Sequence, residues 1–172
     1  ELLAKAPILA SENLAIRWHF IGGLQSNKAR KVVPIVTSVQ SVDRPSLVAE
    51  LSRAATLTRP LDVFIEVNLA GEAQKSGAEP KDVKSLAGLI LAAPGLRLAG
   101  LMTVPPIVDD PEQSRPFFRT LRALRDNLRS TLDLQSEMLT GLSMGMSYDF
   151  EVAIEEGATM VRVGTAIFGS RG

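Results

Sequence analysis

The sequence contains no cysteine and only one histidine, His19. Without cysteine the chain can form neither a disulfide nor a catalytic thiolate, and a single histidine argues against a structural zinc site. No apolar run approaches the ~20 residues that a membrane-spanning helix needs, and no signal-peptide pattern opens the chain. We therefore expect a cytoplasmic protein with no metal site and no membrane partner.

Neither sign of charge predominates, since 19 Lys and Arg residues are balanced by 19 Asp and Glu residues. This balance gives no broad attraction to nucleic acid or to an anionic membrane surface. The 172 residues, 45% of them apolar, suit one domain with a real core. No linker or low-complexity segment divides the chain, so residues 1–172 are expected to form a single domain.

Six short apolar runs alternate with stretches of helical periodicity, which predicts parallel strands joined by right-handed crossovers. The runs cover residues 18–21, 39–42, 63–67, 96–102, the stretch near Leu142, and 160–163. Dividing 172 residues among six units gives about 29 residues each, close to the ~30 of one strand–helix unit. A full (β/α)8 barrel takes ~250 residues. The first choice is therefore a TIM barrel with about six of its eight units, and an open doubly wound sheet is the second.

The clearest helix follows the fourth run, where apolar residues recur at spacings of four, three and four. These residues are Phe117, Leu121, Leu124 and Leu128. Arg119, Arg122 and Arg129 fall on the other side of this helix. That basic face could bind phosphate, but an ordinary solvated helix face is the favoured interpretation.

Two further helices carry start and stop signals. Pro80 marks the first turn of a helix whose inner face carries Val83, Leu86 and Ile90. Asp149 is placed to cap a short helix that stops at Gly157.

Small and hydroxyl residues follow the last two runs, with Ser147 after one and Gly164 and Thr165 after the other. In parallel α/β proteins ligands bind at the carboxyl ends of the strands, and in barrels the loops after the seventh and eighth strands often bind phosphate. Glycine lets a backbone N–H approach an anion, and hydroxyl groups can donate to its oxygens. A phosphate site and two ordinary glycine-containing turns both remain open.

Arg162 is a cation inside an apolar run, which is costly unless the charge is paired. An internal ion pair with Glu66, which has a similar apolar context, is favoured over contact with a ligand ring. For His19, a hydrogen-bonded core position is favoured over a role as general base.

Several of these segments together resemble one known family. Residues 19–22 and 24–28 are similar to the WHFIGxLQxNK signature of the pyridoxal 5′-phosphate (PLP) homeostasis proteins. This YggS/PROSC-type family comprises single-domain relatives of the alanine racemase barrel. Six more segments match the family pattern in order: residues 41–44, 66–68, 75–77, 98–102, 142–147 and 162–169.

The resemblance implies a PLP-binding barrel of the alanine racemase N-terminal type. Ser147, Gly164 and Thr165 would hold the cofactor phosphate, Arg162 would face the pyridine nitrogen, and Met144 and Met146 would line the pocket. An arginine there keeps the ring nitrogen unprotonated and makes the ring a weaker electron sink, which suits a carrier.

The implied function is PLP homeostasis, meaning buffering and delivery of the cofactor by a monomer without robust turnover. The alternative is a PLP-dependent amino-acid racemase-like enzyme, which needs a lysine and an opposing base. A third possibility is a barrel acting on sugar phosphates, such as an isomerase or aldolase.

The sequence departs from the family at its Schiff-base lysine, which lies at the end of the first barrel strand in a segment resembling AVSKT. No such segment is present, and Lys5 stands in a different context, Ala-Lys-Ala-Pro. We therefore expect that these 172 residues cannot hold the cofactor covalently. We also expect an open barrel edge, which favours aggregation or strand exchange with another chain.

Overall fold

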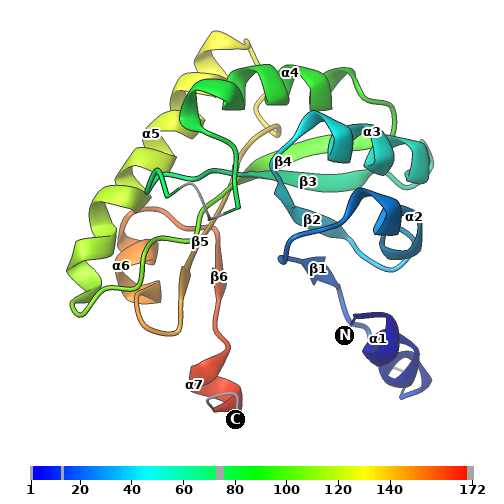
Figure 1. The fold of residues 1–172 in the computed structure, drawn as a ribbon, viewed down its shortest axis with the longest axis horizontal. Coiled ribbons are helices and arrows are strands. Elements are labelled where there is room, and N and C mark those ends of the chain that lie inside the picture. The colour runs from blue at the N-terminus through cyan, green and yellow to red at the C-terminus, as the bar shows by residue number, and fades with distance from the viewer. Residues whose placement is uncertain (1, 13, 73–75, 170–172) are drawn as a thin grey trace.

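A computed structural model describes residues 2–12, 14–72 and 76–169. Six parallel strands form one sheet in chain order (Figure 1). They are β1 (His19–Phe20), β2 (Ser38–Val42), β3 (Leu61–Glu66), β4 (Leu96–Met102), β5 (Gly141–Met146) and β6 (Met160–Arg162). Each predicted run therefore forms a strand, in the predicted order.

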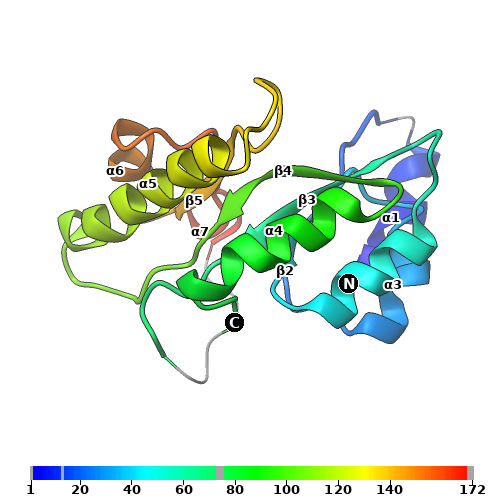
Figure 2. The same cartoon turned by 90° about the horizontal axis from the view of Figure 1, so that it is seen from above.

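Helices precede, join and follow the strands of this curved sheet. They are α1 (Leu2–Ser11), α2 (Ala29–Val32), α3 (Pro45–Ala54), α4 (Val83–Ala92), α5 (Arg115–Thr131), α6 (Phe150–Glu155) and α7 (Thr165–Phe168), with 3-10 turns η1 (Ser26–Lys28), η2 (Pro80–Asp82) and η3 (Pro111–Ser114). Helices α2 to α6 follow the convex face, and Figure 2 shows α4 and α5 along the outside of the sheet. The predicted partial barrel is confirmed, and the doubly wound alternative is wrong. None of the helices in the described residues is long and apolar enough to cross a bilayer.

The main hydrophobic core lies between the strands and these helices. Helix α5 contributes Phe118, Leu121 and Leu128, which are all buried. The predicted stripe placed Phe117 in this set, but Phe117 is only partly buried and Phe118 takes the core position. Spacings of three and seven put 118, 121 and 128 on one helix face, and residue 117 is rotated toward the edge of that face.

The inner surface of the sheet is shaped by one aromatic ring. A Cβ added to Gly100 would lie 2.5 Å from Cε1 of Phe64, and one added to Gly141 would lie 2.6 Å from the same atom. Glycine on β4 and β5 therefore makes room for the Phe64 ring of β3 inside the barrel. Because side chains alternate along a strand, Phe64 also identifies Glu66 as an inward-facing residue.

The predicted helix boundaries are largely confirmed. Helix α4 follows the turn at Pro80 and buries its predicted face. Helix α6 begins after Asp149, and Gly157, with a φ of 93°, follows its end. Asp149 takes the predicted N-cap position, but its side chain accepts no hydrogen bond from the first turn of α6. Its carboxylate accepts instead from the backbone N–H of Met146 at 2.7 Å. Asp149 thereby ties the end of β5 to the start of α6.

The basic face of α5 is not simply solvated. Arg119 and Arg122 both form ion pairs with Glu156, which lies just after α6 and is buried. Arg115 joins the same carboxylate at 2.9 Å. The favoured solvated face is therefore confirmed for Arg119 and Arg122, whose side chains are 63% and 41% exposed, and the ion pairs with Glu156 are an addition that the sequence did not predict.

Candidate ligand site at the carboxyl ends of the strands

The loops after β5 and β6 meet at the hydroxyl group of Ser147. Its Oγ accepts hydrogen bonds from the backbone N–H groups of Gly164 at 3.0 Å and Ala166 at 3.3 Å. These two residues flank Thr165, the first residue of α7. The structure thus brings together three of the residues that the sequence singled out.

The space beside these amides is open. A Cβ added to Gly164 would meet no heavy atom within 4 Å, and both Gly164 and Thr165 are exposed. Because these two N–H groups already donate to Ser147 Oγ, the O–H groups of Ser147 and Thr165 are the donors that remain for a phosphate. An anion could therefore approach the main chain here without displacing a packed side chain.

Arg162 on β6 is held by two neutral oxygens. Its Nη1 donates to Ser143 Oγ at 2.7 Å and its Nη2 donates to the carbonyl oxygen of Thr103 at 3.0 Å. Within the described ranges Arg162 forms no ion pair with Glu66, so the favoured prediction of an internal pair is wrong. The remaining guanidinium N–H groups have no protein partner among those residues, which leaves donors for a ligand.

Two charged groups of opposite sign face the inside of the barrel at this end. Burial, with a smaller contribution from the nearby Asp43 carboxylate, raises the pKa of Glu66 to about 7, although Arg162 acts in the opposite direction. Burial lowers the pKa of Arg162, while Asp149 and Glu66 act in the opposite direction. Glu66 is therefore an acid that changes charge near neutral pH.

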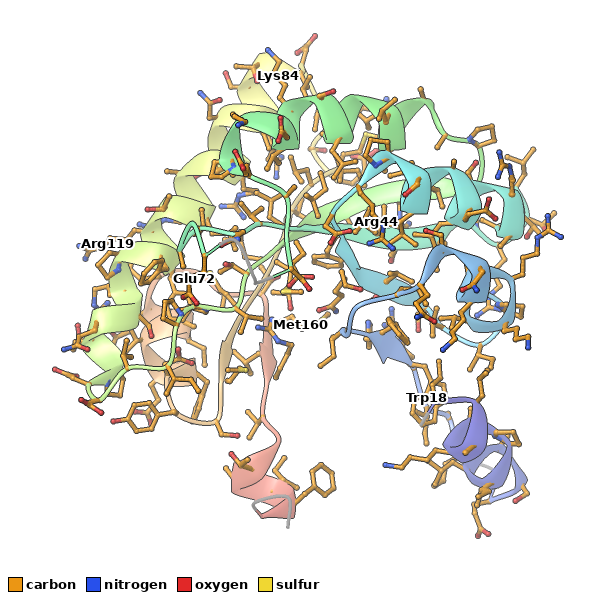
Figure 3. The ribbon with its side chains drawn as sticks, in the orientation of Figure 1. Trp18, Arg44, Glu72, Lys84, Arg119 and Met160 are labelled. Carbon is orange, nitrogen blue, oxygen red and sulfur yellow. The ribbon has the colours of Figure 1, made fainter. Side chains whose placement is uncertain are left out.

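A cavity of about 430 Å³ lies between the two ends of the sheet. It is lined by His19, Ile21, Gln40 and residues 160–164. Figure 3 shows Met160 pointing from β6 into the space that the curved sheet encloses. His19 is exposed, and its Nδ1 is hydrogen-bonded to Ser38 Oγ at 2.7 Å. The predicted hydrogen bond is therefore present, but the predicted core position is wrong.

The two methionines proposed for the pocket lie in different places. Met144 is fully buried in the core between the sheet and the helices. Met146 is 37% exposed and lines a second cavity, of about 360 Å³, with residues 105–109, Tyr148 and Asp149. The structure does not bring Met144 to Arg162, and contact of either methionine with a cofactor stays a prediction.

Sequence reasoning missed the residues that hold Arg162. Ser143 and Gln40 are fully buried polar residues within strands, and Ser143 Oγ donates to Gln40 Oε1 at 2.7 Å. The available signal was a polar residue interrupting an apolar strand on the inward-facing side. Lys75, part of one family-like segment, lies outside the described residues. No cluster of three His, Asp or Glu side chains suited to a metal occurs in the part of the chain that the structure describes.

Residues 3–172 match the family model described as alanine racemase, N-terminal domain. This chain belongs to that family. Two relatives named pyridoxal phosphate homeostasis protein are similar along most of the chain. The one from Aquifex aeolicus is 47% identical over 163 residues, covering 94% of this chain and 70% of the relative. The one from Pseudomonas aeruginosa is 45% identical over 173 residues, covering 99% and 71%.

A solved structure of a family member supports the same assignment. PipY of Synechococcus elongatus with PLP bound is 31% identical, with a TM-score of 0.85 over 97% of this chain and 78% of PipY. The resemblance inferred from the motifs is thus confirmed, and the chain spans about seven-tenths of the length of its curated relatives.

Proposed function

We propose that this chain binds PLP at the carboxyl ends of β5 and β6 and serves in PLP homeostasis, as a carrier that buffers and delivers the cofactor without robust turnover. The observation that carries the proposal is the meeting of two backbone N–H groups at Ser147 Oγ, with Arg162 at the end of the adjacent strand. The Ser147 hydroxyl, which these N–H groups hold in place, suits a phosphate, and the Arg162 guanidinium suits the edge of an aromatic ring.

Each residue has a separate task in this proposal. Ser147, Gly164 and Thr165 hold the phosphate through hydroxyl and backbone donors. Arg162 donates an N–H to the ring nitrogen, and as a permanent cation it keeps that nitrogen unprotonated. When bound, PLP supplies an aldehyde that reacts with amines and a ring that withdraws electrons.

The relatives support this function, since they are named for PLP homeostasis and PipY has been solved with PLP bound. The racemase-like alternative receives less support. A two-base racemase needs two opposed proton-transfer groups. Within residues 2–12, 14–72 and 76–169, neither lysine nor tyrosine lines the cavity beside Arg162. The cytoplasmic location, the monomeric state and the single domain over residues 1–172 stay predictions.

A titration with PLP tests the proposal. Replacing Ser147→Ala together with Thr165→Ala should weaken binding by a few kcal/mol, because each lost charge-assisted hydrogen bond is typically worth about 1.5–3 kcal/mol. The matched control is Ser52→Ala, which removes a hydroxyl bonded to the carbonyl of Pro94 on the amino side of β4. Unchanged affinity in the double variant would place the phosphate elsewhere.

A further inference from the structure

A chain of hydrogen bonds, buried at its centre, runs from Arg162 across the inside of the barrel. Arg162 Nη1 donates to Ser143 Oγ at 2.7 Å, and Ser143 Oγ donates to Gln40 Oε1 at 2.7 Å. Gln40 Nε2 in turn lies 2.8 Å from Met160 Sδ. The chain joins β6, β5 and β2, three strands that are not all neighbours in the sheet.

The donors and acceptors in this chain have one consistent direction. A serine hydroxyl has one hydrogen, and giving it to Gln40 turns the oxygen lone pairs of Ser143 toward Arg162. The amide nitrogen of Gln40 faces the sulfur of Met160, so its oxygen is the end that faces Ser143. Gln40 and Ser143 are both 0% exposed, and a satisfied buried network of this kind rigidifies its members.

The guanidinium of Arg162 forms a second hydrogen bond, from Nη2 to the carbonyl oxygen of Thr103. Thr103 is itself buried, and its hydroxyl donates to the carbonyl oxygen of Val67 at 2.9 Å. Ser143 and Thr103 thus accept hydrogen bonds from two nitrogens of one planar group. These two bonds set the plane of the guanidinium and leave its other N–H groups for the cavity that Arg162 lines.

We propose that Gln40 and Ser143 are positioning residues that hold the Arg162 guanidinium in the orientation in which it meets the PLP ring. This inference rests on the proposed function, because it assigns a purpose to the arginine of that same site. In this arrangement both residues act on the ring through Arg162. Gln40 orients Ser143, and Ser143 orients Arg162.

Two variants break the chain at different points, and PLP titration with recording of the visible spectrum tests them. Ser143→Ala removes the acceptor of Arg162, and Gln40→Met removes the acceptor of Ser143 at similar volume. Each should shift the absorption maximum of bound PLP in the direction that Arg162→Gln shifts it. Each should also weaken binding, by about tenfold for Ser143→Ala.

Two further variants separate positioning from plain stabilisation of the sheet. Ser41→Ala is the matched control, because Ser41 is also buried on β2 but its Oγ bonds the carbonyl oxygen of Gly22 at 2.6 Å. It should leave the spectrum and the affinity unchanged. Gln40→Glu keeps an acceptor for Ser143 and should restore the spectrum that Gln40→Met loses. An unshifted spectrum in both Ser143→Ala and Gln40→Met would overturn the proposal.

Nitrogen NMR of the arginine side chain in the ligand-free protein provides a test that does not depend on PLP. A guanidinium gripped at two nitrogens should give separate Arg162 Nη signals, and these should merge in Ser143→Ala and Gln40→Met but not in Ser41→Ala. If the unmodified chain binds no PLP, the proposed function fails, and this measurement alone then tests whether Ser143 and Gln40 orient Arg162. Separate Arg162 signals that persist in both variants would overturn that inference.

Discussion

Glu66 and Arg162 face the inside of the barrel at the same end without forming an ion pair in the described residues. Their surroundings differ. Arg162 donates hydrogen bonds to neutral oxygens. Glu66 is 9% exposed, and the charge of the nearby Asp43 acts on it. A buried carboxylate beside a second carboxylate favours the protonated form. At the scale of single residues, Glu66 therefore changes its charge near neutral pH at the ligand end of the barrel.

The variant Glu66→Gln tests this pH dependence. The pKa of Glu66 rises from 4.5 to about 7 on folding, so the folded state binds this proton more tightly than the unfolded state does. Stability should then fall as the pH rises from 4.5 to about 7, and the full cost of the buried charge is present above that. Glu66→Gln should be more stable than the unmodified chain at pH 8, by at most about 3 kcal/mol, and the gain should be much smaller near pH 4.5.

Urea unfolding at several pH values measures the difference. The control is Glu151→Gln, which removes an exposed carboxylate from the first turn of α6. A difference between Glu66→Gln and the unmodified chain that stays constant from pH 4.5 to 8 would contradict the prediction.

Among the secondary-structure elements, α6 decides where the Ser147 loop lies. The helix packs against the end of β5 through Gly145, where an added Cβ would lie 2.5 Å from the Cβ of Ala153. On its far side the helix is followed by Glu156, which three arginines of α5 bind. Ser147 lies between these two attachments, in the turn that leads from β5 into α6.

Gly145→Ala should destabilise the protein by about 2–4 kcal/mol, because alanine is strained at positive φ and its methyl group would overpack the helix. The φ of Gly145 is 90°. The matched control is Gly88→Ala in α4, where the added methyl group meets nothing within 4 Å. That control should stabilise the helix by about 0.5–1 kcal/mol. Chemical denaturation measures both, and equal stability of the two variants would contradict the packing argument.

Glu156→Gln should lower the melting temperature at neutral pH. Hydrogen bonds from Arg115 lower the pKa of Glu156, and Arg119 and Arg122 add to the effect. A carboxylate whose pKa is lowered by folding stabilises the fold above its usual titration range, and that contribution is lost as the pH falls. The decrease in melting temperature that Glu156→Gln causes should therefore be smaller in acid.

The matched control for that variant is Glu155→Gln. Among the described residues, Glu155 forms an ion pair with Arg115 alone, at 2.6 Å, and its side chain is 63% exposed. Thermal melts at neutral and acidic pH should show a smaller effect for this control, because exposed ion pairs contribute little. A loss in Glu156→Gln that is as large in acid as at neutral pH would contradict the prediction.

In the whole molecule, the curved sheet ends at β1 and β6, and the cavity beside Arg162 is lined from both ends. No further strand pairs with either end in the ranges that the structure describes. Among the residues that the structure describes, those around this cavity include no lysine. Binding of PLP to these 172 residues should therefore be reversible.

Borohydride reduction of the PLP-loaded chain tests this. Reduction should leave the cofactor removable by dialysis, because no lysine of the described ranges lines the cavity in which the ring would lie. The same chain in urea is the control for random labelling of exposed lysines. Cofactor trapped on one specific lysine of the folded chain would contradict the prediction. Self-association through the sheet ends stays a prediction, which sedimentation over a range of concentrations can measure.

Local patterns in the sequence determined the order and direction of the six strands, the helix after Pro80, and the meeting of Ser147 with the segment around Thr165. Apolar periodicity sets which residues form each strand or helix, and the right-handed crossover then places successive strands side by side. Motifs in their family order were enough to identify the family.

Only the tertiary structure decided which partners the buried polar groups have. Arg162 bonds to residues 19 and 59 positions away, and Ser143 bonds to Gln40 across 103 positions. Such contacts depend on the register and curvature of the whole sheet, which no local pattern encodes. The same reason explains why Glu66 was wrongly paired with Arg162, and why the ion pairs of the α5 arginines with Glu156 were not predicted.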